Sequence, residues 1–314
     1  MQPSDRIGRR MKLHDLGVLI AVVQAGSMGK AAAILNTTQP AVSRSIAELE
    51  RTVGVRLLVR STQGVAPTEY GRALLDGGVA AFDDLRQAVR KIEFLADPTS
   101  GEIRIGCTPI LAATFASAVV DRLSRRYPHM VFHFVTAYLE PLRRELSERH
   151  LDLLIVRRFA PTAEERVNFE PLFDDSYVVA AGAQNHWARR RRIELGELAS
   201  ELWTLPPQDS VIGALAMEAF RASGLDYPRP TVVTDSPQVR ASLLTTGRFL
   251  TIFPASVLGF LKMRSEIKVL PVDLPVARVS NVIVTVKNRV LSPVAQLFIE
   301  QAREVAGLVA RHKR

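Results

Sequence analysis

Three short helical patterns follow one another near the start of the chain, and their order constrains the fold more than any other feature of the sequence. After Leu13, apolar residues recur at spacings of three and four, which predicts a helix that ends at Gly26. Ser27 can cap a second, alanine-rich helix. Thr38 can cap a third, in whose first turn the missing N–H of Pro40 costs little. The sequence therefore predicts three short helices joined by tight turns.

The third helix has two faces of different character. Val42, Ile46 and Leu49 share an apolar face that can anchor the helix in a core. The opposite face carries Gln39, Pro40, Ser43 and Arg44. A solvated amphipathic helix has the same pattern, but the order of the three helices favours a recognition helix that lies in the major groove of DNA.

The segment after the third helix changes to a strand pattern. Gly54, Gly64 and Pro67 bracket a short run rich in β-branched residues, which predicts a β-hairpin. Arg56 and Arg60 lie near the base of this wing. We expect Arg60 to clamp the DNA backbone.

A long helix is predicted over residues 69–97. Its apolar stripe consists of Leu75, Gly78, Phe82, Leu85, Val89, Ile92 and Ala96. Because this stripe repeats every seven residues, as in a coiled-coil seam, we expect the helix to dimerise the chain. The alternative is that the stripe packs on its own domain. A linker rich in helix breakers, Asp97–Gly101, follows.

Strand and helix patterns alternate after residue 101. Predicted strands include 103–106, 131–135, 153–156, 231–233, 250–253 and 282–286, and helices are predicted near 112–126, 141–149, 213–223, 238–246 and from 292 onward. This alternation is typical of βαβ units and predicts a parallel sheet.

Charge is densest at the N-terminal end. The chain has a formal net charge of +9, and residues 1–68 hold nine Lys or Arg against four Asp or Glu. Residues 69–100 hold four against six, and residues 101–314 hold 28 against 22. A basic first segment fits a phosphate-binding face, although many basic chains bind no nucleic acid.

Several classes of protein are disfavoured by what the sequence contains. The apolar runs are short, and no signal peptide or transmembrane helix is recognisable. The single cysteine, Cys107, excludes an internal disulfide and a multi-cysteine metal site. The six histidines form no metal motif, and no catalytic or nucleotide-binding motif is present. We expect a cytoplasmic protein that is not an enzyme and has no metal and no cofactor.

The first part of the chain resembles the DNA-binding domain of LysR-type transcriptional regulators. The resemblance lies in Ala25–Ala32, Thr37–Ile46, Leu49-Glu50, Gly54–Arg60 and Pro67–Gly71. The remainder is also similar to the family at Tyr127-Pro128, Leu151–Leu153, Gly247, Phe253-Pro254 and Ser292-Pro293. The resemblance covers residues 11 to 310.

The resemblance implies an N-terminal all-α winged helix-turn-helix and an α/β two-lobed effector domain like a periplasmic binding protein. We expect a basic tail at 1–10, the DNA-binding domain at 11–68, the linker helix at 69–97 and the effector domain at 101–314. Lobe I is expected at 101–178 with 282–314, and lobe II at 179–281. A homodimer or homotetramer, operator DNA and contact with RNA polymerase are further expectations.

Two sets of site residues follow. The expected DNA contacts are Met28, Lys30, Thr38, Gln39, Pro40, Ser43, Arg44 and Arg60. The expected contacts with a small-molecule effector, an organic acid, are Thr108, Thr136, Arg157, Ser236 and Phe253, since they end strands or begin helices on one side of the expected cleft. In the alternative, Thr108 only caps its helix and Arg157 is solvated.

Two other functions share the same fold. A solute-binding module of a transport system has two such lobes, but no recognisable signal peptide and about 100 additional N-terminal residues argue against it. An enzyme on this fold lacks an identifiable catalytic set. The run Arg189–Arg192 could bind phosphates, but its place in a loop of the sensing domain favours a solvated charged loop.

Overall fold

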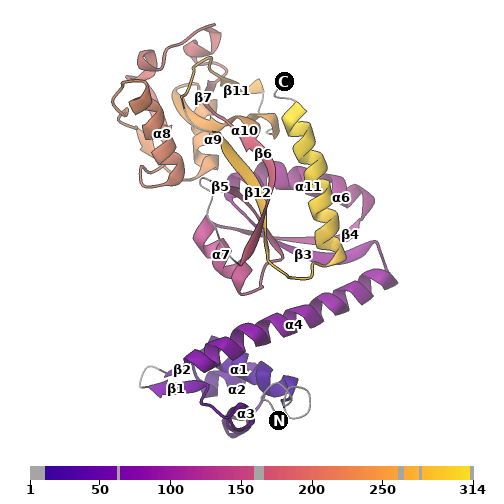
Figure 1. Cartoon of the computed structure of the whole chain (residues 1–314). Coiled ribbons are helices and arrows are strands. Elements are labelled where there is room, and N and C mark those ends of the chain that lie inside the picture. Colours follow the sequence, from indigo (N-terminus) through magenta and orange to yellow (C-terminus); the bar gives the residue numbers. More distant parts are fainter. Residues whose placement is uncertain (1–10, 62–63, 159–165, 261–264, 276–277, 312–314) are drawn as a thin grey trace. The chain divides into compact units, whose positions relative to one another are not determined.

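The computed structural model describes the chain except residues 1–10, 62–63, 159–165, 261–264, 276–277 and 312–314 (Figure 1). The expected basic tail at 1–10 therefore lies outside the described residues. The chain divides into two compact units, 1–89 and 90–314, which we describe separately.

The first unit contains three short helices, a hairpin and most of a long helix (Figure 1). Its elements are α1 (Leu13–Ala25), α2 (Met28–Ile34), α3 (Gln39–Val53), β1 (Leu58–Ser61), β2 (Gly64–Pro67) and α4 (Glu69–Ala96). Gly26 ends α1 with a φ of 69°. The Ser27 hydroxyl accepts from the N–H of Lys30 at 3.1 Å, and the Thr38 hydroxyl accepts from that of Ala41 at 3.4 Å. The predicted caps are thus confirmed.

The hairpin is fixed to the helices by backbone bonds. β1 and β2 pair antiparallel, and the N–H of Val65 donates to the carbonyl of Gly26 at 2.9 Å. A Cβ at Gly64 would lie 2.6 Å from that same carbonyl oxygen, and its φ of 124° also favours glycine. The Glu50 carboxylate of α3 accepts from the N–H of Leu57 at 2.7 Å, just before β1. The wing is therefore held beside both α1 and α3.

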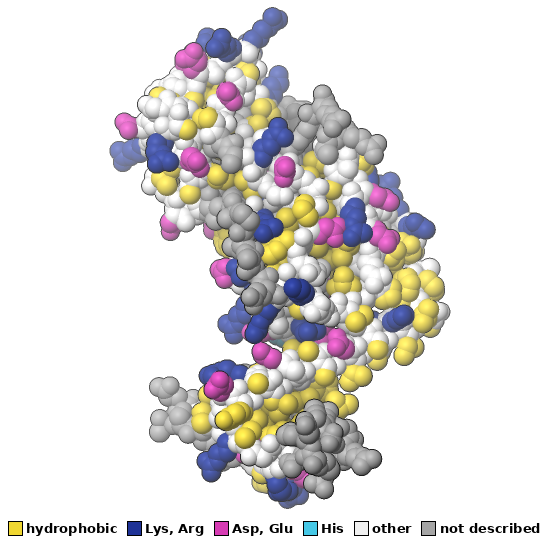
Figure 2. Space-filling model, in the orientation of Figure 1, with side chains coloured by type: hydrophobic (Ala, Val, Ile, Leu, Met, Phe, Trp, Pro, Cys, Tyr) yellow, Lys and Arg dark blue, Asp and Glu magenta, His cyan; other side chains and the backbone are white. Residues whose placement is uncertain are grey.

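The stripe along α4 is divided in two. Near its start, a Cβ at Gly78 would meet the side chain of Leu16 at 2.9 Å, and Phe82 packs in the helical core. Farther along, four apolar side chains are 48–71% exposed: Leu85, Val89, Ile92 and Leu95. Figure 2 shows hydrophobic side chains on the surface near the C-terminal end of α4. The first half of the stripe packs on its own domain, as the alternative had it, and the second half is free to contact another surface.

The second unit has two sheets of five strands each, which define its two lobes. Lobe I has the strand order β4-β3-β5-β12-β6, formed by His129–Thr136, Ser100–Cys107, Leu153–Arg158, Val279–Val286 and Val167–Asp175. Lobe II has the order β11-β7-β10-β8-β9, formed by Ile267–Val269, Tyr177–Gly182, Phe249–Pro254, Leu202–Leu205 and Val232–Val233. β6 continues directly into β7, and the chain returns from β11 to β12, so two crossovers join the lobes.

The prediction of a parallel sheet is confirmed for three strands of each sheet, which in lobe II are β8, β9 and β10, and is wrong for the other strands. β3 pairs parallel with β4 and β5, but β12 runs antiparallel to β5 and β6. In lobe II, β7 is antiparallel to β10 and β11. The returning strand β12 comes from the other lobe rather than from a βαβ unit, so local alternation of strand and helix does not encode its direction.

Helices cover the sheets of both lobes (Figure 1). They are α5 (Pro109–Leu111), α6 (Ser117–Arg126), α7 (Leu139–Ser147), α8 (Val211–Ala222), α9 (Pro237–Thr245), α10 (Ala255–Phe260) and α11 (Pro293–Arg311), with short 3-10 turns at His186–Arg189 and Leu195–Leu198. The helix predicted at 112–126 is interrupted by a π-helical turn, Ala112–Ala116, where the Ser117 hydroxyl donates to the carbonyl of Ala112 at 2.6 Å. Cores form around Phe115 and Phe298 in lobe I and around Trp203 and Phe220 in lobe II.

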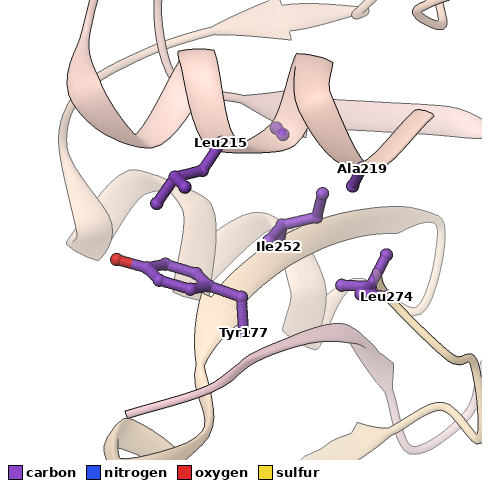
Figure 3. Close-up of a pocket in the computed structure, with 6 residues that line it drawn as sticks. Tyr177, Leu215, Ala219, Ile252 and Leu274 are labelled. Carbon is purple, nitrogen blue, oxygen red and sulfur yellow. The ribbon is translucent and has the colours of Figure 1, made fainter. Parts of the chain in front are cut away.

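An apolar gap lies inside lobe II between α8 and the sheet (Figure 3). Tyr177, Leu215, Ala219, Ile252 and Leu274 line it, together with Ala216. The gap is too tight for a water molecule, so it cannot hold a ligand in this structure. The Tyr177 hydroxyl points away from Leu274 (Figure 3).

Within the described residues, no single helix has both the length and the apolarity to cross a membrane. α1 and α2 meet that test only as a pair, and they are bent by 117° at their junction.

Candidate DNA-binding surface and effector site

The polar face of α3 is exposed, whereas its apolar face is held in the core. Val42, Ile46 and Leu49 are buried. Gln39, Pro40 and Arg44 are exposed, and Ser43 is half-buried beside them. Thr38 is exposed at the start of the helix, and its hydroxyl keeps a proton to donate while it accepts the capping N–H. The face thus offers a guanidinium, an amide and hydroxyls to a ligand outside the domain.

The residues expected to contact DNA beyond α3 differ in their exposure. Lys30 is exposed on α2. The neighbouring Gly29 lies close to α3, because a Cβ at this position would be 3.6 Å from Oε1 of Gln39. Met28 is only 5% exposed and packs in the helical core, which does not fit the prediction that it contacts DNA. Its spacing before Ala31 and Ala32 places it on the inward face of α2. The backbone of Arg60 pairs with Val65 in the wing, but its side chain lies outside the described residues.

A second group of candidate site residues lies where the two lobes join. We define the interlobe polar cluster as Thr108, Arg157, Tyr177, Arg240 and Asn281. Each has a buried side-chain nitrogen or oxygen without a hydrogen-bond partner: Thr108 Oγ1, Arg157 Nε and Nη2, Tyr177 Oη, Arg240 Nε and Asn281 Oδ1. A buried polar atom without a partner costs about 1–3 kcal/mol, and more if it is charged. Such atoms gathered at one place indicate a site that a ligand completes.

Lobe I contributes three members of the cluster through its central strands. Arg157 lies in β5 directly opposite Asn281 of β12, and Asn281 lies opposite Phe173 of β6. Thr108 follows β3, and its N–H donates to the carbonyl of Ile155 at 3.4 Å. Arg157 is 8% exposed, so its guanidinium is inside the protein and not in solvent.

Lobe II contributes Arg240 and Tyr177. Arg240 is 4% exposed; its Nη1 donates to the carbonyl of Ile252 at 3.1 Å, and its guanidinium carbon lies 4.8 Å from the ring centroid of Phe253. In the pairing of β10 with β7, Phe253 lies opposite Val178, one residue after Tyr177. Arg240, which lies over Phe253, and Tyr177, at the start of β7, are therefore both beside the crossover from β6 to β7.

The ionisable groups of the cluster act on one another. Burial, and then the positive charge of Arg157, lower the pKa of Arg240 to about 10. Burial raises the pKa of Tyr177, and the Arg157 and Arg240 charges oppose that rise. Burial likewise raises the pKa of the neighbouring Cys107 thiol, against the effect of Arg157, so this thiol is inert. Two guanidinium groups from different lobes thus share one electrostatic environment.

The two nearby carboxylates, Asp175 and Asp235, act on the cluster through their charge without forming an ion pair with either arginine. Asp175 is buried and accepts from both the N–H and the hydroxyl of Ser256, at the first turn of α10. Asp235 is exposed. Desolvation of Tyr138 in lobe I, and then its hydrogen bond to Asp235 and the negative charge of Asp235, raise the pKa of Tyr138 to about 12. Within the part of the chain that the structure describes, neither Arg157 nor Arg240 has a carboxylate oxygen within 4.0 Å.

The residues expected to bind the effector have different surroundings. Thr108 precedes α5 without capping it, and Arg157 is buried, so both alternatives stated from the sequence are wrong. Phe253 is buried beneath Arg240. Thr136 is exposed at the end of β4, beside Cys107 in the sheet, and the Ser236 hydroxyl caps α9 by accepting from Val239 at 3.3 Å.

Sequence reasoning missed Arg240, Tyr177 and Asn281. Arg240 and Leu244 share one face of α9 at a spacing of four, and both are buried. An arginine in line with an apolar residue on a core-facing helix is a signal that could have found it. Tyr177 and Asn281 carry no comparable local signal, because their burial results from the crossover strands.

Two other charged features do not form such a site. Among the described residues, the ligand atoms of Glu145, Glu148 and His150 lie within 4.8 Å of one another, but this cluster is at the surface and His150 pairs with Glu145 at 3.0 Å. Arg189–Arg192 is exposed, and Arg190 pairs with Glu197 at 2.9 Å.

A winged helix-turn-helix followed by a two-lobed α/β unit defines a class of bacterial transcriptional regulator. Residues 13–72 match the family model "Bacterial regulatory helix-turn-helix protein, lysR family", and residues 96–307 match "LysR substrate binding domain". The chain belongs to the LysR family. It is a DNA-binding transcriptional regulator with an effector-binding domain, as the resemblance in its sequence predicted, and the solute-binding alternative is not favoured.

Individual relatives are distant but extend over nearly the whole chain. The HTH-type transcriptional regulator TdcA of Escherichia coli (strain K12) is 27% identical over 298 residues, 94% of each chain. The structure of a full-length OxyR variant from Pseudomonas aeruginosa has a TM-score of 0.63 at 21% identity and covers 95% of both chains. Full-length CbnR in complex with its target DNA has a TM-score of 0.54 at 20% identity and covers 94% of this chain and 100% of that one.

Proposed function

We propose that this regulator binds operator DNA through α3 and the wing, as a dimer or tetramer paired through α4, and that a small organic anion at the interlobe polar cluster controls its binding to DNA. The protein acts by binding and not by catalysis. Its targets place it in the cytoplasm, where it meets the bacterial genome and RNA polymerase.

The buried, unpartnered Arg157 carries the effector part of the proposal. Its Nε and Nη2 form one edge of the guanidinium, and both lack a partner. That edge matches the two oxygens of a carboxylate in a bidentate pair. Thr108 can add a hydroxyl donor beside it. Thr136, Ser236 and Phe253 are proposed as further contacts of the effector, and the ring of Phe253 lies against the Arg240 guanidinium.

Access to the cluster requires motion. Because Arg157 and Arg240 are both buried, an effector can enter only when the lobes separate, and it leaves the closed form more stable than the open one. Chain segments at the two crossovers can absorb such a hinge motion. The effector thereby selects one arrangement of the α/β unit.

The DNA-binding part rests on the exposed face of α3. Gln39, Ser43 and Arg44 are proposed to contact base edges or nearby phosphates, and Thr38, Pro40 and Lys30 are proposed to contact DNA beside them; exposure of Gln39, Arg44, Thr38, Pro40 and Lys30 supports this. Paired α4 helices would hold two such faces about 34 Å apart, one turn of DNA. Arg60 is proposed to contact the backbone from the wing.

A mobility-shift assay with the DNA that flanks the gene tests the function. We expect the full-length protein to form a discrete complex that unrelated DNA in excess does not displace, and to form it with altered affinity when organic acids are added. Equal affinity for flanking and unrelated DNA would contradict a sequence-specific regulator.

A further inference from the structure

Two buried guanidinium groups, one from each lobe, lie at the same interlobe cluster, and neither has a carboxylate partner among the described residues. Arg157 comes from a strand of lobe I, and Arg240 comes from a helix that packs on the sheet of lobe II. A single arginine would be sufficient for a monocarboxylate. The second one requires its own explanation.

The free donors of the two arginines are separate. Arg157 has its Nε–Nη2 edge free, which a single carboxylate saturates in a bidentate pair. Arg240 uses Nη1 on the carbonyl of Ile252 and lies against the ring of Phe253, and its Nε is without a partner. A carboxylate paired with Arg157 in this way can reach the Arg240 donor only through its remaining lone pairs, whereas a second carboxylate can pair with that donor directly.

The two positive charges of Arg157 and Arg240 also favour a ligand with two anionic groups. Asp175 is bonded to Ser256, and the charge of the exposed Asp235 raises the pKa of Arg240 by less than burial and the Arg157 charge lower it. Like charges held in a low-dielectric region repel, and here they belong to different lobes. Without a ligand this repulsion opposes closure of the lobes.

We propose that the effector is a small dicarboxylate that bridges the lobes, with one carboxylate on Arg157 and the other on Arg240. This proposal rests on the proposed function and specifies its ligand. The Thr108 and Tyr177 hydroxyls can each donate to a carboxylate oxygen. Binding neutralises both guanidinium groups and removes the repulsion between the lobes, so ligand charge and domain closure are coupled.

The test uses the full-length protein and three dicarboxylates of increasing length: succinate, glutarate and adipate. Each is compared with its monoamide and its diamide, which keep the shape and remove one or two charges. Calorimetry should give the tightest binding for one dicarboxylate and at least about a tenfold loss for each carboxylate replaced by an amide. Inorganic phosphate, which concentrates its charge on one group, should bind more weakly than that dicarboxylate.

Three variants assign the charges to residues. In Arg157→Gln and Arg240→Gln, the dicarboxylate should bind no more tightly than its monoamide. Arg158→Gln is the matched control, since Arg158 is the next residue of the strand and lies 4.4 Å over the ring of Phe169, on the opposite face of the sheet. It should keep the wild-type preference. Arg157→Gln should also raise the melting temperature of the ligand-free protein, because it removes an unpaired buried charge.

The outcomes separate this proposal from the function on which it rests. Monoamides or phosphate that bind as tightly as the dicarboxylates would overturn it, and so would the absence of any stabilisation by all three dicarboxylates at tens of millimolar. A lower melting temperature for ligand-free Arg157→Gln would overturn the assignment of that charge. In each case operator binding by the same preparation would leave the regulator function intact.

Discussion

At the scale of single residues, the two proposed sites differ in the exposure of their arginines. Arg44 is exposed on a helix whose other face is buried, and Arg157 and Arg240 are buried without an anion. The first arrangement presents a donor to an external partner. The second arrangement leaves buried N–H donors of Arg157 and Arg240 without a hydrogen-bond acceptor among the described residues of the protein.

Arg44→Ala tests the exposed face. A good bidentate contact with a base is worth about 1–3 kcal/mol, so we expect operator affinity to fall about tenfold or more, measured by fluorescence anisotropy with labelled DNA. Arg122→Ala, which removes an exposed helical arginine from the second unit, is the control and should bind as wild type does. Wild-type affinity for a folded Arg44→Ala protein would remove Arg44 from the interface.

Arg240 predicts a pH dependence of effector binding. Its pKa is lowered to about 10, so it loses its charge within an accessible range, in an environment shared with Arg157, Tyr177, Tyr138 and Asp235. The pKa of Arg240 is lower in the folded protein than in the unfolded chain. Burial of its charge therefore lowers the free energy of unfolding at every pH below about 10, and this loss of stability is relieved as pH rises further. Anion affinity should therefore be flat near neutrality and fall above about pH 10. Arg240→Gln should lack this fall in a calorimetric titration; a fall of equal size in that variant would contradict the assignment.

At the scale of elements, local chemistry predicted more than long-range pairing did. The caps at Ser27 and Thr38 and the two faces of α3 depend on neighbours within one or two turns, and the sequence predicted them correctly. The antiparallel direction of β12 depends on a partner more than 100 residues away and was predicted wrongly. Arg240 of α9 was missed although its spacing of four from the buried Leu244 places both residues on the same face of the helix.

The exposed half of the α4 stripe predicts how chains pair. Leu85→Asp with Val89→Asp places two charges on this half while leaving Gly78 and Phe82 in their own core. Light scattering should then show smaller particles than wild type, and the operator footprint should be lost. Lys91→Asp, two residues from Val89 and so on the far side of the helix, should keep the wild-type mass. An unchanged mass in the double variant would refute pairing through α4.

A buried ion pair links several elements of the second unit. Asp152 accepts from Arg289 at 3.2 Å, from Arg90 at the end of α4 at 3.1 Å, and from the N–H of Arg104 in β3 at 2.9 Å. Asp152→Asn leaves a buried guanidinium without its counter-ion and should lower the free energy of unfolding by about 3–5 kcal/mol in urea denaturation. Asp121→Asn, which breaks an exposed pair with Arg125, should change it by less than about 1 kcal/mol. Equal changes in the free energy of unfolding for the two variants would show that the Asp152 network does not stabilise the second unit.

At the scale of the whole molecule, one chain combines a DNA-binding domain with an effector-binding domain, in which we propose that an anion completes the interlobe polar cluster. Family membership establishes the two activities, and the interlobe polar cluster supplies the chemistry by which one could govern the other. The account requires that occupancy of the cluster changes how the protein engages its operator. A ligand can do so only to the extent that it binds one conformation more tightly than another.

The most direct test is a footprinting titration of the DNA flanking the gene, with wild-type protein and Arg157→Gln, in the presence and absence of the dicarboxylate that binds most tightly. The account predicts a specific footprint for both proteins. It further predicts that the dicarboxylate changes the affinity or extent of the wild-type footprint and leaves that of Arg157→Gln unchanged. The same ligand-induced change in both proteins, or no change in either, would contradict control of DNA binding through the interlobe polar cluster.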